Sequence, residues 1–371
     1  MLPHIVKSRV FDSVSKMPIR YVTPIPFSEA TGLVAEVYEI VADEFFINGA
    51  ITTHSVRPPL LAGMWCAGRE LVMVEGHYSR DVKEGLGVSF AQTNGCTYCE
   101  DMMVSVVYGA GDEKFARDIR GGNQQNIDDT ELRALHQWAQ NYRAVGSDIL
   151  RHPPFDARRA PEMIGVAFMF NYLNRYVKVF FDGTPLNPVF GSESIKTGMF
   201  KAFGNELKPS VTKHLEYGRA AALLPPADLP HDMRWAESDD QIAEPISRWA
   251  AAIEHAAVPD ISERVRDVVG AAISQWRGEQ MGLSRNWVEP YLVGLAEKDY
   301  AVAKIGLLTA LAPTQISDDV IEDFRRYDGS DGALVSLVSW SAFAATRRVA
   351  AWIAGDAECL PYKDDYIEQA A

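Results

Sequence analysis

Apolar residues recur three and four positions apart along most of the chain, which is the period of an amphipathic helix. Ser28 or Thr31 is a suitable N-cap for the first segment of this kind. The apolar face of that segment consists of Val34, Val37, Tyr38, Val41 and Phe45. The same period predicts helices over about 60–74, 80–93, 112–119, 129–144 and 159–181. The alternation typical of strands is hardly visible anywhere, so we predict an all-α protein.

Proline and glycine divide the chain into four parts. Residues 1–27 contain several prolines and no sustained period, and we expect an arm that lies on the body or on a neighbouring subunit. Residues 28–182 form the first helical domain, and residues 237–371 form a second helical half. The segment 183–236 between them is rich in Pro and Gly, which predicts a linker around a short helical piece.

The second half resembles a degenerate copy of the first. When the two are aligned, the second half has neither thiols nor an acid where the first half has them. The paired positions are Ala303 with Glu84, Gln315 with Cys96, and Asp318 with Cys99. We therefore expect two tandem pseudo-repeats, the second being a structural half that completes an interface normally supplied by another subunit.

Residues 84–103 carry most of the recognisable chemistry. An Asn-Gly turn signal precedes Cys96, and the next Gly or Pro is Gly109, which we expect to end the intervening helix. Cys96 and Cys99 therefore lie in the first turn of a helix, where the macrodipole favours a thiolate. Residues three positions apart share a helical face, so the two sulfurs can form a bridge when one thiol is oxidised.

This stretch resembles the alkylhydroperoxidase D (AhpD) and carboxymuconolactone decarboxylase superfamily. The resemblance rests on Glu84, the twelve-residue step to Cys96, the C-x-x-C pair with Tyr98 inside it, and the apolar helix that contains residues 161–175. It is clear over the first helical domain and faint over the second half. It implies an AhpD-like all-α bundle that forms homo-oligomers.

In the peroxidase branch, the resemblance implies that Cys99 attacks a peroxide and that Cys96 resolves the resulting sulfenate. Glu84 would belong to a proton relay, directly or through Tyr98 and water. A lipoyl or other dithiol reductant would then reset the pair. The family relay usually ends in a His four residues after the second cysteine, where this chain has Met103. Methionine cannot transfer a proton, so Met103 is expected only to line the substrate site, and the thiol is expected to be less reactive.

Two further features affect the expected reactivity of the cysteine pair. Glu100 and Asp101 place negative charge directly after the pair, which opposes a thiolate. His54 and His77 lie near enough in sequence to replace the missing base, although each is more simply a loop or cap residue.

Three functions remain open from the sequence. The first is a thiol-dependent oxidoreductase that reduces an organic hydroperoxide or disulfide through Cys96 and Cys99. The second is a repurposed enzyme that acts without redox chemistry on a small carboxylate metabolite. There Arg175, a charge on an apolar helix, would anchor the carboxylate, or it would form a core ion pair with Glu84. The third is a non-catalytic oligomeric protein.

The composition of the chain limits the partners and the cellular location that we expect for the protein. The 36 basic and 50 acidic residues give a net charge of −14 and a pI near 5.1, which argues against nucleic acid and anionic membranes as partners. We see neither a signal peptide nor an apolar run long enough to span a bilayer, and we expect a cytoplasmic protein with a small-molecule substrate. No metal-ligand spacing or nucleotide fingerprint stands out, so no metal or cofactor is expected. Cys66 lies on an apolar helical face and is expected to be buried and inert.

Overall fold

The computed structural model describes residues 19–183 and 193–355. The predicted all-α class is confirmed, because the described residues contain helices and no strand, apart from an isolated bridge between Ile19 and Phe181. The described end of the N-terminal arm lies on the body. The backbone N–H of Ile25 donates to Ser55 Oγ at 2.8 Å.

The first half follows the predicted helices closely. It contains α2 (Gly32–Glu44), α3 (Gly49–Thr52), α4 (Pro58–Ala67), the π-helical segment η3 (Gly68–Met73), α5 (Arg80–Asn94), α6 (Thr97–Ala110), α7 (Glu113–Arg120), α8 (Thr130–Asn141), α9 (Asp148–Arg151) and α10 (Ala160–Phe180). The helix predicted over 60–74 is therefore α4 followed by a π-helical stretch.

Glycines set the ends of α5 and α6. Gly95 has φ of 64°, a left-handed conformation that ends α5 and turns the chain into α6. The prediction that Gly109 ends α6 is wrong, since the helix continues to Gly111, where φ is 104°. Gly109 is needed for packing instead. A Cβ atom at this position would lie 2.8 Å from the carbonyl oxygen of Gly204, so glycine lets two backbones touch.

Gly204 belongs to α11 (Glu193–Val211), which lies inside the segment expected to be a linker. This helix packs along α6, the helix that carries the cysteines. The α-helices that follow are α12 (Asp240–Ala256), α13 (Glu263–Gln275), α14 (Glu289–Leu292), α15 (Glu297–Leu311), α16 (Asp318–Arg325) and α17 (Asp331–Ile353). Short 3-10 turns connect them, among them η6 (His231–Ala236) before α12 and η9 (Pro313–Gln315) between α15 and α16.

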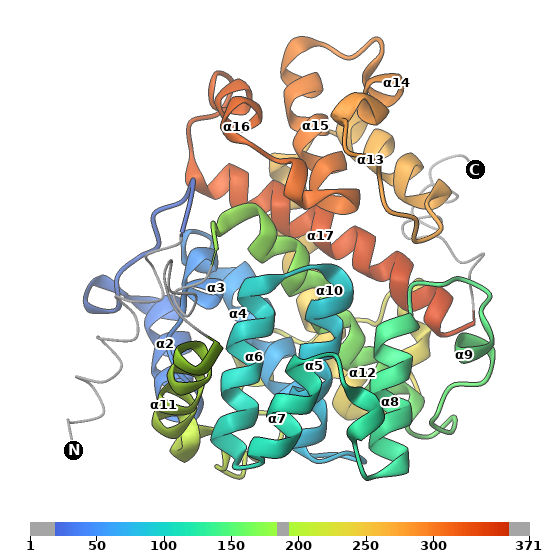
Figure 1. The fold of residues 1–371 in the computed structure, drawn as a ribbon. Coiled ribbons are helices and arrows are strands. Elements are labelled where there is room, and N and C mark those ends of the chain that lie inside the picture. The colour runs from blue at the N-terminus through green and yellow to red at the C-terminus, as the bar shows by residue number, and fades with distance from the viewer. Residues whose placement is uncertain (1–18, 184–192, 356–371) are drawn as a thin grey trace.

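Helices α10 and α17 pack against each other in the core. In Figure 1, α17 crosses the middle of the molecule, with α13–α16 on one side and the blue and green helices of the first half on the other. Phe168 of α10 joins the halves, since its ring lies 5.2 Å from that of Phe343 and 5.7 Å from that of Trp249. Within the described ranges, no helix combines the length and the apolar character that crossing a membrane would require.

Candidate active site

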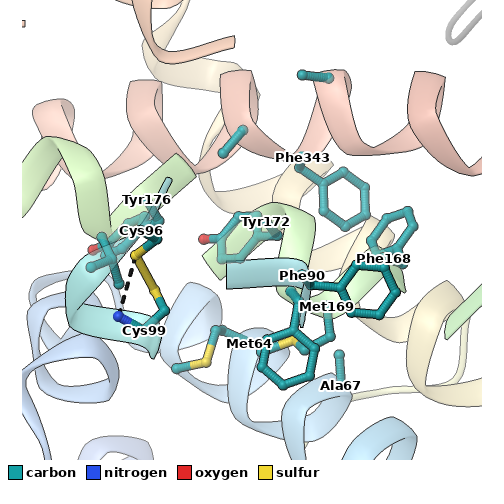
Figure 2. Packing of buried hydrophobic residues seen from close by; sticks show 14 of the residues in the cluster. Met64, Ala67, Phe90, Cys96, Cys99, Phe168, Met169, Tyr172, Tyr176 and Phe343 are labelled. Atoms are coloured by element: carbon teal, nitrogen blue, oxygen red, sulfur yellow. Dashed lines mark hydrogen bonds between the residues drawn. A yellow bond between two sulfur atoms is a disulfide. The ribbon is translucent and has the colours of Figure 1, made fainter. Parts of the chain in front are cut away.

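The two cysteines lie where the sequence predicted, at the start of α6. Cys96 is the N-cap residue and Cys99 is in the first turn, and their sulfurs form a disulfide with Cα atoms 5.3 Å apart. The backbone N–H of Cys99 donates to the Cys96 sulfur at 3.4 Å (Figure 2). Both residues are buried. The helix N-terminus thus directs an N–H group at the Cys96 sulfur, which favours a thiolate at Cys96 when the pair is reduced.

A cavity of about 120 Å³ lies beside the pair. Cys99 lines it together with three other predicted site residues, Glu84, Tyr98 and Met103. Most of the remaining wall is apolar and comes from α4, η3, α6, α10 and the segment before α3. Its larger side chains are Phe45, Phe46, Met64, Trp65, Met73 and Met169.

Glu84 is buried on α5 and pairs with Arg80 one turn earlier, with Nε and Oε1 2.8 Å apart. Burial raises the pKa of the Glu84 carboxyl group, and the positive charge of Arg80 opposes that rise. Glu84 also lines a second, polar cavity of about 300 Å³ on the other side of α5 and α6, whose wall includes Asp112 and Asp118. The carboxyl group therefore stands between the cysteine cavity and a more polar one.

Tyr98 and Met103 lie on the wall of the cysteine cavity but differ in what they offer chemically. The Tyr98 hydroxyl is buried and has no hydrogen-bond partner among the described residues. Burial also raises the pKa of this hydroxyl, so the group stays protonated. The Tyr98 ring packs against Phe181 with centroids 4.6 Å apart. Met103 is half-buried and adds only apolar surface.

The acids that follow the pair are both partnered. Gln92 Nε2 donates to Glu100 Oε1 at 3.0 Å, and Lys196 Nζ of α11 lies 3.3 Å from Asp101 Oδ1. The expected repulsion of a thiolate by these carboxylates is thereby reduced, and α11 contributes to that reduction.

Neither candidate histidine lines the cavity. His54 is buried, with Nε2 2.8 Å from the Tyr172 hydroxyl and Nδ1 3.0 Å from the Ala50 carbonyl oxygen. Burial lowers the pKa of His54 to about 3. His77 is exposed, and its backbone N–H donates to Glu162. Both are structural in these positions.

Arg175 lies apart from the other predicted site residues. Its Nε donates to the Ala310 carbonyl oxygen at 2.9 Å, and its Nη1 donates to Asn171 Oδ1 at 3.1 Å. The guanidinium carbon is 5.5 Å from the centroid of the Trp276 ring. The structure therefore brings Cys96, Cys99, Glu84, Tyr98 and Met103 together and places Arg175 between the two halves.

Sequence reasoning missed Arg80 and the origin of the apolar wall. The spacing of four residues between Arg80 and Glu84 on one helix was a signal for their ion pair. No local sequence signal predicts that Phe45 or Met64 lines the cavity, because they reach it only through the packing of α4 and its neighbours.

Fold and site define an all-α, AhpD-like protein with a cysteine pair that can form a disulfide. A Mycobacterium tuberculosis protein named alkyl hydroperoxide reductase Rv2159c is 30% identical to this chain over 343 residues, which are 92% of this chain and 96% of that protein. This chain therefore belongs to the AhpD-like alkyl hydroperoxide reductase family. No protein-family model and no solved structure match the sequence.

Proposed function

We propose that this protein is a thiol peroxidase that reduces an organic hydroperoxide with Cys99 and Cys96. The observation that carries the proposal is that Cys99 lines an apolar cavity and lies within disulfide reach of Cys96. Cys96 is not among the residues that line this cavity. A peroxide in the cavity therefore meets Cys99 first, and Cys96 stands behind it as the resolving thiol.

The chemistry proceeds in two balanced steps. The Cys99 thiolate attacks the terminal oxygen of R–O–OH, the O–O bond breaks, and the alkoxide takes a proton and leaves as R–OH. Cys99 is then a sulfenic acid. The Cys96 thiol attacks its sulfur, the disulfide forms, and the sulfenic oxygen leaves as water. A lipoyl or other dithiol supplies the two electrons that restore both thiols.

Glu84 is the proposed proton acceptor for this sequence. It lines the same cavity as Cys99, and burial raises its pKa, which brings the carboxyl group nearer the range where it can exchange protons at neutral pH. Tyr98, which also lines the cavity, provides a hydroxyl that donates to a water or to the leaving oxygen.

The cavity wall supports a bulky apolar peroxide as substrate. Phenylalanine and methionine side chains dominate the wall, and neither type can hydrogen-bond strongly to a small polar peroxide. We expect a hydroperoxide with an alkyl or aryl substituent to react faster than hydrogen peroxide.

The non-redox alternative has less support. It assigns the anchoring of a substrate carboxylate to Arg175, which does not line the cysteine cavity. Within residues 19–183 and 193–355, no other Arg, Lys or His lines that cavity, so a carboxylate would be desolvated there without a cation from this part of the chain.

The test is turnover of cumene hydroperoxide with dihydrolipoamide as reductant. We expect Cys99→Ser to stop turnover because no thiolate remains in the cavity. Cys96→Ser should reduce one equivalent of peroxide and stop with Cys99 as a sulfenic acid, visible by mass spectrometry after dimedone trapping.

Cys66→Ser is the matched control, since Cys66 is fully buried and burial raises the pKa of its thiol, so it should not react. Full turnover by Cys99→Ser would overturn the thiol mechanism.

A further inference from the structure

A second, small cavity of about 40 Å³ lies where α10 of the first half meets the end of α15 in the second half. Three cationic side chains line it, Arg143, Arg175 and Lys178. The rest of the wall comes from two amide side chains, the end of α15 and the start of η9, namely Asn94, Asn174, Ala310, Leu311 and Pro313. Among the described residues, no acidic side chain lines this cavity.

The three cations contact only neutral groups. Lys178 Nζ donates to the Asn94 carbonyl oxygen at 2.7 Å, and Arg143 Nη2 donates to the Gly278 carbonyl oxygen at 3.1 Å. Arg175, which is 7% exposed, donates to carbonyl and amide oxygens. Among the described residues, none of the three forms an ion pair.

Several buried cations elsewhere in this protein have carboxylate partners. The pairs are Arg69 with Glu44 and Glu70, Arg80 with Glu84, Lys83 with Glu162, and Arg347 with Asp232. Removing a cation from water is costly unless an anion compensates it. The cluster between the halves, where Arg175 is buried and Arg143 and Lys178 are half-buried, differs from these pairs because no carboxylate among the described residues pairs with it.

Mutual repulsion acts inside the cluster. Burial, together with the charges of Arg175 and Arg143, lowers the pKa of Lys178 to about 8. Burial lowers the pKa of Arg175 to about 10, and the charge of Arg143 acts in the same direction. An anion among the three would relieve both the repulsion and the cost of burial.

We propose that this cavity binds an oxyanion, either a phosphate or a carboxylate group. Arginine offers paired N–H donors that match the oxygens of both groups, and lysine adds a point charge. The volume exceeds the ~10–15 Å³ that one water needs, and it suits a small oxyanion or the charged end of a larger molecule. The site is separate from the cysteine cavity and does not depend on the proposed peroxidase activity.

The location places such a ligand beside the segment that leads into the redox pair. Asn94 lines the site, is the last residue of α5, and is followed by the left-handed Gly95 that leads into Cys96. A bound oxyanion thus contacts the segment that holds the resolving cysteine.

Thermal unfolding of the full chain, measured with added sodium phosphate, acetate or chloride at equal ionic strength, tests the proposal. We expect phosphate or acetate to raise the melting temperature in a saturable way, with half-saturation in the millimolar range, while chloride does not. A response to phosphate alone assigns a phosphate group, and a response to acetate alone assigns a carboxylate.

The variants Arg143→Gln and Lys178→Gln should each raise the half-saturating concentration at least tenfold. They are preferred to Arg175→Gln, because Arg175 is more deeply buried and its loss also removes packing. Arg326→Gln on α16 is the matched control, since Arg326 is exposed and pairs only with nearby Asp323 among the described residues. The proposal is overturned if neither oxyanion shifts the wild-type protein more than chloride does, or if the control weakens the response as much as the two site variants.

Discussion

At the scale of single residues, Met103 is the departure from the AhpD-like pattern that should matter most for the rate of peroxide reduction. It lines the cavity that also contains Cys99 and Glu84, and its thioether cannot accept or donate the proton that thiol chemistry moves. The AhpD-like pattern has a His at this position. The cavity therefore retains the nucleophile and the acid of the relay but lacks its imidazole.

Met103→His is expected to raise the rate of reaction with cumene hydroperoxide by at least about tenfold, since a positioned general base contributes roughly 10²–10⁴-fold. Stopped-flow measurement of Cys99 oxidation at pH 7 isolates this step from reductant recycling. The matched control is Met102→His, because Met102 lines the same cavity one residue earlier, at a different angle around α6. An equal gain in both variants, or none in Met103→His, would contradict a relay through this position.

The positions of the candidate site residues follow from the sequence where their determinants are local. Cys96, Cys99 and Tyr98 are set by the first turn of one helix, and Glu84 is placed by the helix before it, so the sequence pattern could bring them together. Arg175 could not be placed in this way. Its position depends on contact with Ala310, 135 residues later in the chain, and no period within α10 contains that information.

At the scale of elements, α11 is the main difference from the sequence prediction. Its stretch contains Gly204 and Pro209, residues that usually mark loops, and the sequence was therefore interpreted as a linker around a short helical piece. Pro209 is accommodated near the end of the helix. Gly204 is required, because α11 and α6 touch through their backbones at this residue and Gly109. The same contact explains why Gly109 does not end α6.

Gly204→Ala should therefore destabilise the protein by about 1–3 kcal/mol or more, since overpacking of a close contact costs this much. A Cβ atom at Gly204 would lie 2.7 Å from the Ser105 carbonyl oxygen, and the backbone of α6 cannot move aside easily. The displaced α11 would also weaken the contact between Lys196 and Asp101 beside the cysteine pair. Urea unfolding followed by far-UV circular dichroism gives the free-energy change.

Gly198→Ala on the same helix is the control. No atom lies within 4 Å of a Cβ built at Gly198, so the substitution should be neutral or should stabilise the protein by about 0.5–1 kcal/mol through helix propensity. If the two variants lose stability equally, then the effect at Gly204 does not come from the contact with α6.

At the scale of the whole molecule, the helices of the two predicted halves pack within each half and then on each other. Helix α5 packs on α6 and α10, and α15 packs on α16 and α17. The two long helices, α10 and α17, then pack on each other, so each half covers the face that the other would expose (Figure 1). The pseudo-repeat remains a prediction, and the extent of the core that the halves share could not be predicted, because it depends on contacts between distant segments.

We expect the two halves to unfold as one cooperative unit, and Phe168 is the residue that tests this. Its ring, on α10, contacts Trp249 and Phe343 of the second half and Trp235 of the turn η6 just before it. Phe168→Ala should cost about 3–5 kcal/mol, because it leaves a cavity among large aromatic side chains. Urea unfolding monitored by tryptophan fluorescence and by far-UV circular dichroism should give coincident single transitions, both shifted to lower urea.

Leu283→Ala, at a fully exposed leucine, should leave the midpoint unchanged. Two separated transitions in the wild-type protein would mean that each half is stable on its own, since the aromatic contacts around Phe168 would then not couple them.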